Sequence, residues 1–368
     1  MKILLDASTL LTSKSGVGHY TYKISSALFS NKKFGASFFA QNNFYKNLKD
    51  IKFKKKNIFN RFINKNIRIK HFISNSNLNY YINKNKIEIF HQPNFITYNL
   101  SIKNISTVHD LSWIHYPNFF LKDELKYFNL YFEKSLKNST RIIVHSNFIK
   151  NEISNLFNYP ENLIEVVYED MRINLNKLAE NRCSEFLNKF NLKYKNFFLI
   201  INNIENRKNF DFILDVYQRL DFKIRDQYPL IIFGMTGRHS NQILDKISKV
   251  KNCEYLGYLD EKFLNQCFSS AKIFFYPSIY EGFGISPIEA MASGTPVLAS
   301  YIDSAKEILE DKAILLDINN QKDWISNIKY LLDDDNIYEE MVQKGIYHSL
   351  KFKPGNTVAK ILEIYDKI

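Results

Sequence analysis

The sequence predicts an α/β protein with two Rossmann-like domains, each built on a parallel sheet and facing a shared cleft. Three observations lead to this prediction. Strands and helices alternate along the chain, which is the pattern of doubly wound folds. A strand, a glycine loop and a helix follow one another twice, at residues 2–29 and again at 272–292. The length of 368 residues also exceeds what one hydrophobic core usually organises.

The first domain is expected to begin with a strand at Lys2–Asp6, a glycine loop and a helix from about His19 to Phe29. Residues 31–86 carry weak patterns, with short strands expected at 36–40 and 68–73. Short apolar runs predict the remaining strands. These strands are placed at 87–91, 105–110, 141–144 and 160–170, with an amphipathic helix at 122–137 and a helix that Ser146 caps.

A polar, helix-prone stretch at 171–194 is the expected connector between the domains. The second domain then opens with an apolar run at 197–201, which is typical of a central parallel strand. The other predicted elements are a helix at 210–220, strands at 230–233, 253–256 and 272–276, a helix at 259–270, surface helices within 321–350 and a last helix at 355–368.

Composition favours a cytoplasmic protein. Three cysteines, Cys183, Cys253 and Cys267, show no metal-ligand spacing and indicate a reducing compartment without a disulfide framework. The first residues predict a strand that breaks at Asp6, so they do not resemble a signal peptide. No apolar stretch approaches the roughly 20 residues of a membrane span.

Basic residues are unevenly distributed. The formal net charge is +12, and residues 1–170 hold 24 Lys and Arg against 12 Asp and Glu, so this half carries the whole excess. The densest segment, Lys46–Lys70, suits an anionic membrane surface, at about 1 kcal/mol per basic residue near the lipid. A solvated charged loop is the alternative. No nucleic-acid partner is predicted, because helix-turn-helix, RNP and zinc patterns are missing. The segment's residues are Lys49, Lys52, Lys54, Lys55, Lys56, Arg61, Lys65 and Arg68, interleaved with Phe53, Phe59 and Phe62.

The second glycine loop predicts an anion site. It follows the strand that ends at Tyr276, and Gly282 and Gly284 let bare backbone approach a ligand. Ser286 is the expected N-cap of the next helix, with Pro287 at its first position and Gly294 just past its end. Backbone amides at a helix N-terminus are well suited to a phosphate.

Two carboxylates, Glu281 and Glu289, bracket this loop. Carboxylates are poor partners for a phosphate, but they accept hydrogen bonds from sugar hydroxyls, so the combination indicates a nucleotide sugar. Another interpretation is a capping box, in which Glu289 only accepts from the Ser286 amide. A capping box does not require Glu281 or the two glycines.

The segment Tyr276–Val297 resembles the E-x7-E signature of retaining glycosyltransferase family 4, whose usual form is close to YPSxxEGFGxPxxEAMAxGxPV. Ser286 is a benign departure from this form. Three shorter motifs are also similar to the family: Gly16–Tyr20 to its G-x-G-x-Y, His109–Ser112 with Pro117 to its HDLS-x5-P, and Arg207–Asn209 to its R-K-N. The resemblance covers most of the chain, and it is faint over 21–100.

The resemblance implies the GT-B fold, with an acceptor-binding domain at 1–175 plus 353–368 and a nucleotide-sugar-binding domain at 176–352. It places Gly16 and Gly18 over the donor phosphates and the acceptor, and His109 against the donor sugar or the acceptor. Spacing alone leaves simpler alternatives open. The two glycines could form a turn without a ligand. A histidine at a strand end more often packs in the core or caps a helix, and Asp110 could simply cap the segment that follows it.

In the second domain, Arg207 and Lys208 follow a strand's carboxyl end, where ligands bind in open α/β sheets. They could neutralise a leaving diphosphate, although a surface basic pair is commoner. The loops at Gly234 and Gly257 are expected to border the nucleotide base. Glu307 aligns with a recurring family glutamate, although Lys306 replaces the proline before it.

These residues define the expected chemistry. Arg207, Lys208 and the amides of Gly282, Phe283, Gly284 and Ile285 would stabilise charge that grows on the β-phosphate, so neither a metal nor a cofactor is expected. Asp333–Asp335 is interpreted as a surface helix end. Glu281 would hold hydroxyls of the donor sugar, and Glu289 the ribose. The resemblance implies retention, with a phosphate oxygen assisting deprotonation of the acceptor; a covalent carboxylate route stays open.

The predicted function is transfer of a sugar, from GDP-mannose as the first candidate, to a saccharide or lipid-linked acceptor of a surface polysaccharide. The signature and the HDLS stretch resemble mannosyl- and rhamnosyl-type members. The alternatives are a UDP-sugar-dependent transferase, a nucleotide-sugar epimerase or phosphorylase of similar architecture, and a non-catalytic basic binder. The expected location is the cytoplasm, with the inner face of the cell membrane as a possibility.

Overall fold

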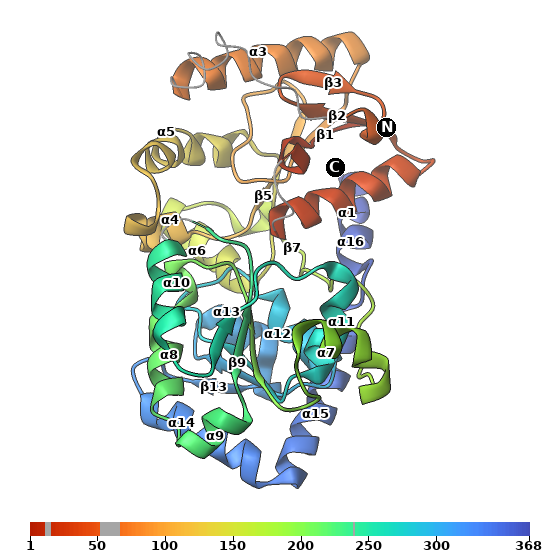
Figure 1. The fold of residues 1–368 in the computed structure, drawn as a ribbon. Coiled ribbons are helices and arrows are strands. Elements are labelled where there is room, and N and C mark those ends of the chain that lie inside the picture. The colour runs from red at the N-terminus through yellow and green to blue at the C-terminus, as the bar shows by residue number, and fades with distance from the viewer. Residues whose placement is uncertain (12–15, 52–66, 238–239) are drawn as a thin grey trace. The chain divides into compact units, whose positions relative to one another are not determined.

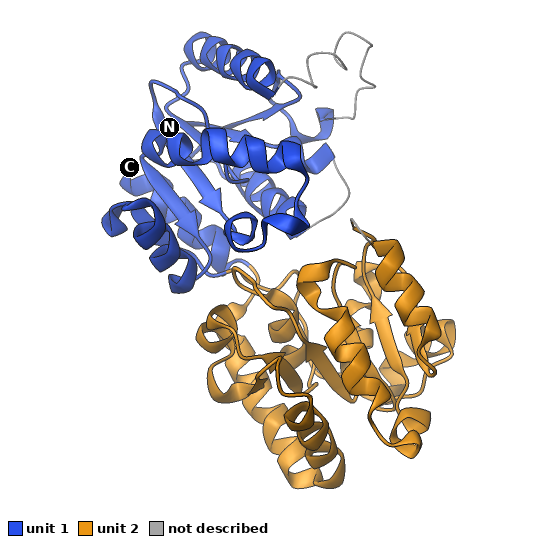
Figure 2. Cartoon of the chain, turned by 90° about the vertical axis from the view of Figure 1, so that its left-hand side faces the viewer, with its two compact units in different colours: residues 1–168, 355–368 blue, residues 169–354 orange. Residues whose placement is uncertain are grey.

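The computed structural model describes residues 1–11, 16–51, 67–237 and 240–368 (Figure 1). The chain divides into two compact units: unit 1 comprises residues 1–168 and 355–368, and unit 2 comprises residues 169–354 (Figure 2). The expected domain divisions lay at residues 175 and 353. The following predicted members of the basic segment lie outside the described residues: Lys52, Phe53, Lys54, Lys55, Lys56, Phe59, Arg61, Phe62 and Lys65.

Unit 1 is built on a seven-stranded sheet with the order β3-β2-β1-β4-β5-β6-β7. Its edge strand β3 runs antiparallel to β2, and the other neighbours are parallel. The strands are β1 (Lys2–Asp6), β2 (Gly35–Ala40), β3 (Asn43–Tyr45), β4 (Ile89–Gln92), β5 (Lys103–Val108), β6 (Arg141–Val144) and β7 (Ile164–Val166). The predicted parallel α/β architecture of this part is confirmed.

The described helices of unit 1 are α1 (Gly16–Ser30), α3 (Ile67–Asn85), α4 (Ser112–His115), α5 (Lys122–Asn138), α6 (Asn147–Phe157) and α16 (Asn356–Lys367). The predicted strand at 68–73 is wrong, because these residues begin α3. Read alone, Ile69, Phe72 and Ile73 favour a strand. The structure buries Ser74, Leu78 and Ile82 instead, and their four-residue spacing is that of one helix face.

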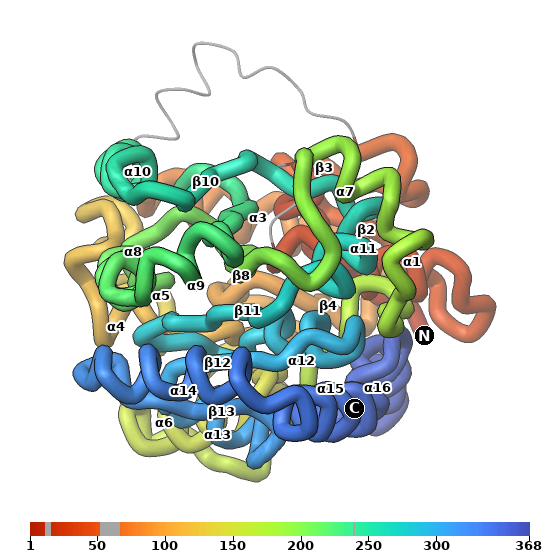
Figure 3. Tube along the Cα trace, turned by 60° about the horizontal axis from the view of Figure 1, so that its bottom comes forward, coloured from red at the N-terminus to blue at the C-terminus, as the bar shows by residue number. Residues whose placement is uncertain are grey.

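Unit 2 is built on a fully parallel six-stranded sheet with the order β10-β9-β8-β11-β12-β13 (Figure 3). The strands are β8 (Phe198–Ile201), β9 (Leu230–Phe233), β10 (Cys253–Tyr255), β11 (Ile273–Tyr276), β12 (Val297–Ser300) and β13 (Ile314–Leu316). Side chains of β8 alternate between two hydrophobic clusters, with Leu199 in one and Phe198 and Ile200 in the other. Both faces of this sheet are therefore buried, as the continuous apolar run predicts.

The described helices of unit 2 are α7 (Ser184–Phe190), α8 (Phe210–Gln218), α9 (Phe222–Gln227), α10 (Ser240–Lys249), α11 (Leu264–Ser270), α12 (Ile285–Ala292), α13 (Asp303–Leu309), α14 (Gln321–Asp333) and α15 (Asp335–Ser349). Side chains of α8, α10 and α14 join one hydrophobic cluster, whereas those of α7, α11, α12 and α13 join the other. The two groups of helices thus cover opposite faces of the sheet.

Two segments near the boundaries between the units pack in a way that their position in the sequence does not indicate. Part of the predicted connector packs into unit 2, because Met171, Leu175 and Leu178 are buried in its core and the Met171 amide donates to the Phe352 carbonyl at 2.9 Å. The final helix α16 belongs to unit 1, where Ile361 and Tyr365 join the core. Within the described ranges, no helix has the length and apolar character needed to cross a membrane.

Candidate functional site

The carboxyl ends of four neighbouring strands bring most predicted site residues of unit 2 to one edge of the sheet. Strands β9, β8, β11 and β12 lie side by side and run parallel, so their carboxyl ends meet at the same edge. The residues that follow them are Gly234 after β9, Arg207 and Lys208 after β8, residues 281–285 after β11, and Glu307 in α13 after β12. This is the edge at which open α/β sheets bind ligands.

Arg207, Lys208 and Glu281 form a buried ion-paired triad at this edge. The Arg207 guanidinium donates to Glu281 Oε2 at 2.5 Å, and Lys208 Nζ donates to Oε1 at 2.5 Å. Arg207 also donates to the Tyr280 carbonyl at 2.8 Å, and its own carbonyl accepts from the Ile279 amide at 3.0 Å. These hydrogen bonds join the loop after β8 to the loop after β11. The alternative of a surface basic pair is wrong, because only 7% of Lys208 is exposed.

The triad carries two cations and one anion. Burial opposes ionisation of Glu281, but the charges of Arg207 and Lys208 outweigh it and lower the pKa of this carboxyl to about 2. Burial and the adjacent Arg207 lower the pKa of Lys208, while Glu281 acts in the opposite direction. With Glu281 ionised and both cations charged, the triad has a net charge of +1, which favours an anionic ligand.

We expect the triad to make folding stability sensitive to acid. Ionised Glu281 stabilises the folded state above its ordinary pKa of 4.5, and this contribution is lost as the pH falls toward its folded pKa of about 2. The difference between the two pKa values corresponds to at most about 3.4 kcal/mol of the free energy of unfolding. Glu281→Gln should therefore flatten the fall in the free energy of unfolding over this range, measured by urea unfolding at each pH. The exposed Glu185→Gln is the control, and an unchanged acid slope in Glu281→Gln would contradict the assignment.

The start of α12 differs from the prediction. The helix begins at Ile285 with Gly284 as N-cap, so Ser286 and Pro287 lie inside its first turn and Ser286 is not the cap. Gly284 has φ +94°, and a Cβ added there would lie 2.6 Å from the Tyr276 hydroxyl. A residue with a side chain would thus be strained and would collide. Gly294, with φ +74°, follows the helix end as predicted.

Two predicted ligand contacts are internal to unit 2 in this structure. The Phe283 side chain is 5% exposed and packs edge to face on Phe352 at a centroid distance of 6.0 Å. A Cβ added at Gly234 would lie 1.7 Å from the Asn202 carbonyl oxygen, so this glycine is required by the packing of two strand ends. Any ligand contact from Phe283 or Gly234 therefore has to come from the backbone.

Glu289 pairs with Arg172, a residue that sequence reasoning missed. Oε1 of the fully buried Glu289 accepts from Arg172 Nε at 2.8 Å and from its amide at 3.2 Å, and Oε2 accepts from the guanidinium. The capping-box interpretation is wrong, because no side chain caps α12. A carboxylate offers about four acceptor positions, so these three hydrogen bonds orient Glu289 and leave room for about one more.

The remaining acidic candidates of unit 2 are placed as follows. Glu307 is half-buried in α13, and it neighbours Lys306, which pairs with Asp303. Asp333 ends α14, and the Asp334 side chain caps α15 by accepting from the amides of Asn336 and Ile337 at 2.9 and 3.0 Å. The interpretation of this acidic run as a surface helix end is confirmed.

In unit 1, His109 follows the carboxyl end of β5 and lies in an aromatic environment. Its ring contacts Tyr20 edge to face at a centroid distance of 5.2 Å, and Tyr20 also contacts His145 at 4.9 Å. Gly16 and Gly18 open α1, which carries Tyr20, with Gly16 exposed and Gly18 buried. Asp110 accepts from the Ser112 amide and hydroxyl at 2.9 and 2.6 Å, so it does order the start of α4.

His109 and His145 form a hydrogen-bonded chain between two carbonyl groups. His109 Nε2 lies 2.8 Å from the Pro93 oxygen, His145 Nδ1 lies 3.0 Å from the Val167 oxygen, and His145 Nε2 lies 3.1 Å from His109 Nδ1. Carbonyl oxygens only accept, so both outer nitrogens need a hydrogen, and the central contact needs a third. Burial lowers the pKa of His145 to about 4, although its hydrogen bond to Val167 opposes this. Burial therefore disfavours a second hydrogen on His145.

We expect nitrogen-15 NMR of the imidazole rings to show only one protonated ring nitrogen in His145 near neutral pH, because burial lowers the pKa of His145 to about 4. His145→Phe should remove the hydrogen bonds to Val167 and His109 and should cost about 0.5–1.5 kcal/mol of stability for each. His115→Phe, at a helix of unit 1 outside this chain of hydrogen bonds, is the control. A doubly protonated His145 near neutral pH in the wild-type protein would contradict this expectation.

Comparison with known proteins identifies the class. The family model described as Glycosyltransferase Family 4 matches residues 16–169, and that described as Glycosyl transferases group 1 matches residues 184–347. O-antigen chain mannosyltransferase B of Escherichia coli is 30% identical over 280 residues, which cover 75% of this chain and 74% of that protein. The chain therefore belongs to glycosyltransferase family 4.

Two further comparisons agree with this assignment. O-antigen chain mannosyltransferase RfbU of Salmonella typhimurium is 29% identical over 261 residues, which cover 69% of each chain. The crystal structure of WaaG, a glycosyltransferase involved in lipopolysaccharide biosynthesis, has a TM-score of 0.73 at 11% identity and covers 99% of both chains. The latter likeness supports the fold alone, and the predicted GT-B fold class is confirmed.

Proposed function

We propose that this glycosyltransferase moves a hexose from a nucleoside-diphosphate sugar, with GDP-mannose as the first candidate, to a saccharide or lipid-linked acceptor of a surface polysaccharide. The observation that carries the proposal is the buried Arg207–Glu281–Lys208 triad beside the start of α12. The Escherichia coli and Salmonella relatives are named O-antigen chain mannosyltransferases, which favours mannose and an O-antigen type of acceptor.

The donor diphosphate is assigned to the triad and the loop before α12. Arg207 offers a planar fork and Lys208 a point charge, and both are already held in place by Glu281. The amides of residues 282–285 add the dipole of a helix N-terminus. These donors stabilise charge on the β-phosphate as the sugar leaves, so the proposed reaction uses neither a metal nor a cofactor.

Glu281 and Glu289 are assigned to hydroxyl groups of the donor, the first to the sugar and the second to the ribose. Each is oriented by cations, and the pairing of Glu289 with Arg172 leaves about one acceptor position. His109 is assigned to the sugar or the acceptor. The glycines at the start of α1 are assigned to the phosphates and the acceptor.

The proposed reaction retains the configuration of the sugar. The bond between the anomeric carbon and the phosphate oxygen breaks through an oxocarbenium-like transition state, and the acceptor oxygen forms its bond on the same face. The leaving phosphate oxygen takes the acceptor's hydroxyl proton. The chemical step therefore needs no protein nucleophile, and the proposed contributions of the chain are positioning and charge stabilisation.

A thermal-shift panel of nucleotide sugars tests the proposal. A donor that binds the folded state stabilises it by RT ln(1 + [L]/Kd), or about 2.7 kcal/mol at a concentration of 100 Kd. GDP-mannose is expected to raise Tm more than UDP-glucose, UDP-galactose or free mannose. A larger rise in Tm with a UDP-sugar would make that sugar nucleotide the donor in place of GDP-mannose and would leave the proposed transferase reaction unchanged. The proposed transferase function would be wrong if no nucleotide sugar raised Tm, or if the enzyme converted the nucleotide sugar when no acceptor was present.

A further inference from the structure

A chain of four buried hydroxyl and imidazole groups crosses one face of the sheet in unit 1. Tyr365 Oη, on α16, lies 2.6 Å from His91 Nδ1, on β4. His91 Nε2 lies 2.9 Å from Thr107 Oγ1, on β5, and this oxygen lies 3.0 Å from Tyr20 Oη, on α1. All four side chains are buried. The chain therefore connects the last helix of the sequence to the first.

The register of the sheet brings these groups together. His91 is paired with Ile105 on the neighbouring parallel strand, and Thr107, two residues further along, lies on the same face as Ile105. Tyr20 and Tyr365 belong to the hydrophobic cluster that contains Ile105, so α1 and α16 both cover this face. The four polar groups thus meet inside an apolar core.

The hydrogen of the Tyr365 hydroxyl fixes the start of the chain. Burial raises the pKa of Tyr365 well above its ordinary value, so the hydroxyl keeps its hydrogen. Burial, together with the charge of His109, lowers the pKa of His91 to about 3, so this imidazole is neutral and has one N–H and one acceptor nitrogen. Within the described residues, His91 is the hydrogen-bond partner of the Tyr365 hydroxyl. Tyr365 therefore donates to His91 Nδ1.

The order of the remaining hydrogen bonds follows from this first one. Because Nδ1 accepts, the hydrogen of His91 is on Nε2, which donates to Thr107 Oγ1. The Thr107 hydroxyl then donates to Tyr20 Oη. The reverse order would leave the Tyr365 hydrogen buried without an acceptor among the described residues, which costs free energy. Every bond of the chain thus points from α16 toward Tyr20.

The far end of the chain lies against the histidine pair of the candidate site. The ring of Tyr20 packs edge to face on both His109 and His145. Thr107 lies two residues before His109, so its hydrogen bond holds the hydroxyl end of the Tyr20 ring on the segment that carries His109. A buried ring held in this way cannot turn without breaking that bond. The position of the His109 ring therefore depends on the chain.

We propose that Tyr365, His91 and Thr107 are positioning residues, which hold Tyr20 and, through it, His109 in the arrangement that the site requires. The last helix of the sequence is then a functional part of the site in unit 1. The order of the hydrogen bonds is independent of the reaction. The effect on turnover rests on the function proposed above.

Nitrogen-15 NMR of the imidazole rings, without a ligand, tests the direction of the chain. His91 is expected to carry a single hydrogen, on Nε2, and to stay neutral from about pH 5 to pH 8, because its pKa is about 3. A hydrogen on Nδ1 would reverse the chain and would overturn the proposal.

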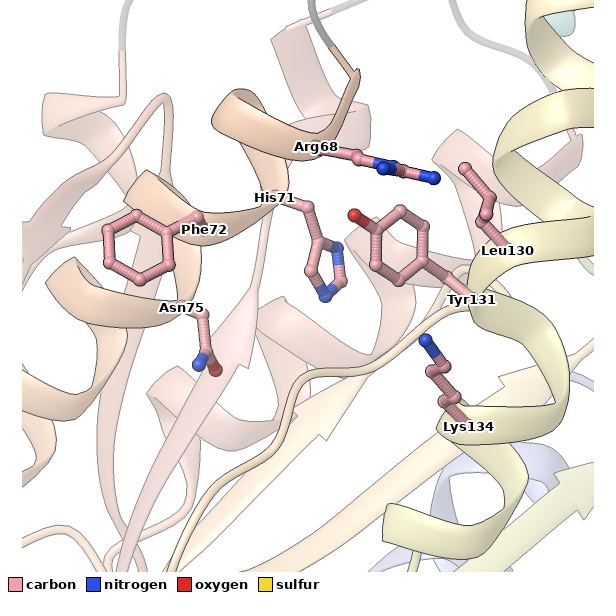
Figure 4. A pocket seen from close by; sticks show the side chains of 7 residues that line it. All are labelled: Arg68, His71, Phe72, Asn75, Leu130, Tyr131 and Lys134. Carbon is pink, nitrogen blue, oxygen red and sulfur yellow. The ribbon is translucent and has the colours of Figure 1, made fainter.

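Tyr365→Phe tests whether the far end of the chain responds. The variant keeps the ring and removes the hydroxyl that donates to His91, so the ring signals of His109 are expected to shift. The signals of His71 should stay in place, because His71 lines a separate pocket between α3 and α5 (Figure 4). Unchanged His109 signals in Tyr365→Phe would show that the chain does not position this ring.

The matched control is Tyr159→Phe. The Tyr159 hydroxyl is also buried in unit 1 and donates to the Ser139 carbonyl at 3.3 Å, outside the chain. Its loss should leave the signals of His91 and His109 unchanged. A shift of His109 as large as that in Tyr365→Phe would make the response a general effect of a lost buried hydroxyl, and the proposal would be wrong.

His91→Gln and His91→Leu separate hydrogen bonding from packing. A glutamine amide can accept from Tyr365 and donate to Thr107, as the imidazole does, whereas leucine can do neither. With a donor from the thermal-shift panel, kcat is expected to fall about tenfold in His91→Leu and to stay within about twofold in His91→Gln, because a small displacement of a site residue costs turnover. Equal losses in the two variants would assign His91 to packing alone.

Tyr365→Phe keeps the kinetic test decisive if His91→Leu does not fold. The same loss of about tenfold in kcat is expected for it. If the protein transfers sugar and Tyr365→Phe has the kcat of the wild type, the proposed function is retained and the positioning role is wrong. If the NMR results are as expected and the protein transfers no sugar, the chain is retained and only the proposed function fails.

Discussion

Lys208→Met is expected to lower kcat by about 10²–10³-fold, which is the effect of removing one preorganised donor to a developing negative charge. Methionine keeps much of the volume of the buried stem and removes only the ammonium group that Glu281 holds in place. The effect should be in kcat more than in KM, because charge on the β-phosphate is larger in the transition state than in the bound donor. Steady-state kinetics with a donor from the thermal-shift panel measures it.

Two controls separate catalysis from folding. Lys246→Met removes a cation of the same kind from an exposed pair with Asp211, so its kcat should match that of the wild type. Lys208→Met keeps Glu281 paired with Arg207, so no buried carboxylate is left without a cation, and urea unfolding at the pH of the assay should show a folded variant. Unchanged kcat in folded Lys208→Met would remove Lys208 from the mechanism.

The largest expected loss of stability is that of Arg172→Met, at about 3–5 kcal/mol of the free energy of unfolding of unit 2. Glu289 is fully buried, and Arg172 supplies its hydrogen bonds from the guanidinium and the amide. Without the guanidinium, an ionised carboxylate is left in the core with little compensation. Urea unfolding followed by circular dichroism measures the change.

The same experiment includes a double-mutant cycle. Arg172→Met with Glu289→Met should regain most of the loss, since replacing a whole buried pair by apolar side chains is often neutral. Lys177 lies close to Arg172 in the sequence and forms an exposed ion pair with Glu339. Lys177→Met breaks this pair and should change the free energy of unfolding by about 0–1 kcal/mol. A loss in Arg172→Met no larger than in Lys177→Met would show that the contact contributes little to folding.

Local patterns were sufficient for much of the fold. Apolar runs predicted the strands at Lys2–Asp6, Arg141–Val144 and Leu230–Phe233 with the bounds that the structure has. They failed at residues 68–73, where β-branched and aromatic side chains belong to a helix whose buried face is set by residues farther along the chain. The N-cap of α12 was misplaced for a related reason: Gly284 has a positive φ, and the hydroxyl of Tyr276, eight positions earlier, occupies the space that a side chain there would need.

The sequence by itself determined the alternation of strands and helices, the class of enzyme and the residues at strand ends, because each depends on neighbours along the chain or on a dense local motif. Tertiary structure alone decided which charges meet. Glu281 pairs with two cations, and Glu289 pairs with Arg172, which lies 117 positions earlier in the sequence. His109 forms a hydrogen bond with His145. The physical reason is that a buried charge is stable only beside a partner, and that partner comes from whichever strand end or connecting segment the fold brings to it.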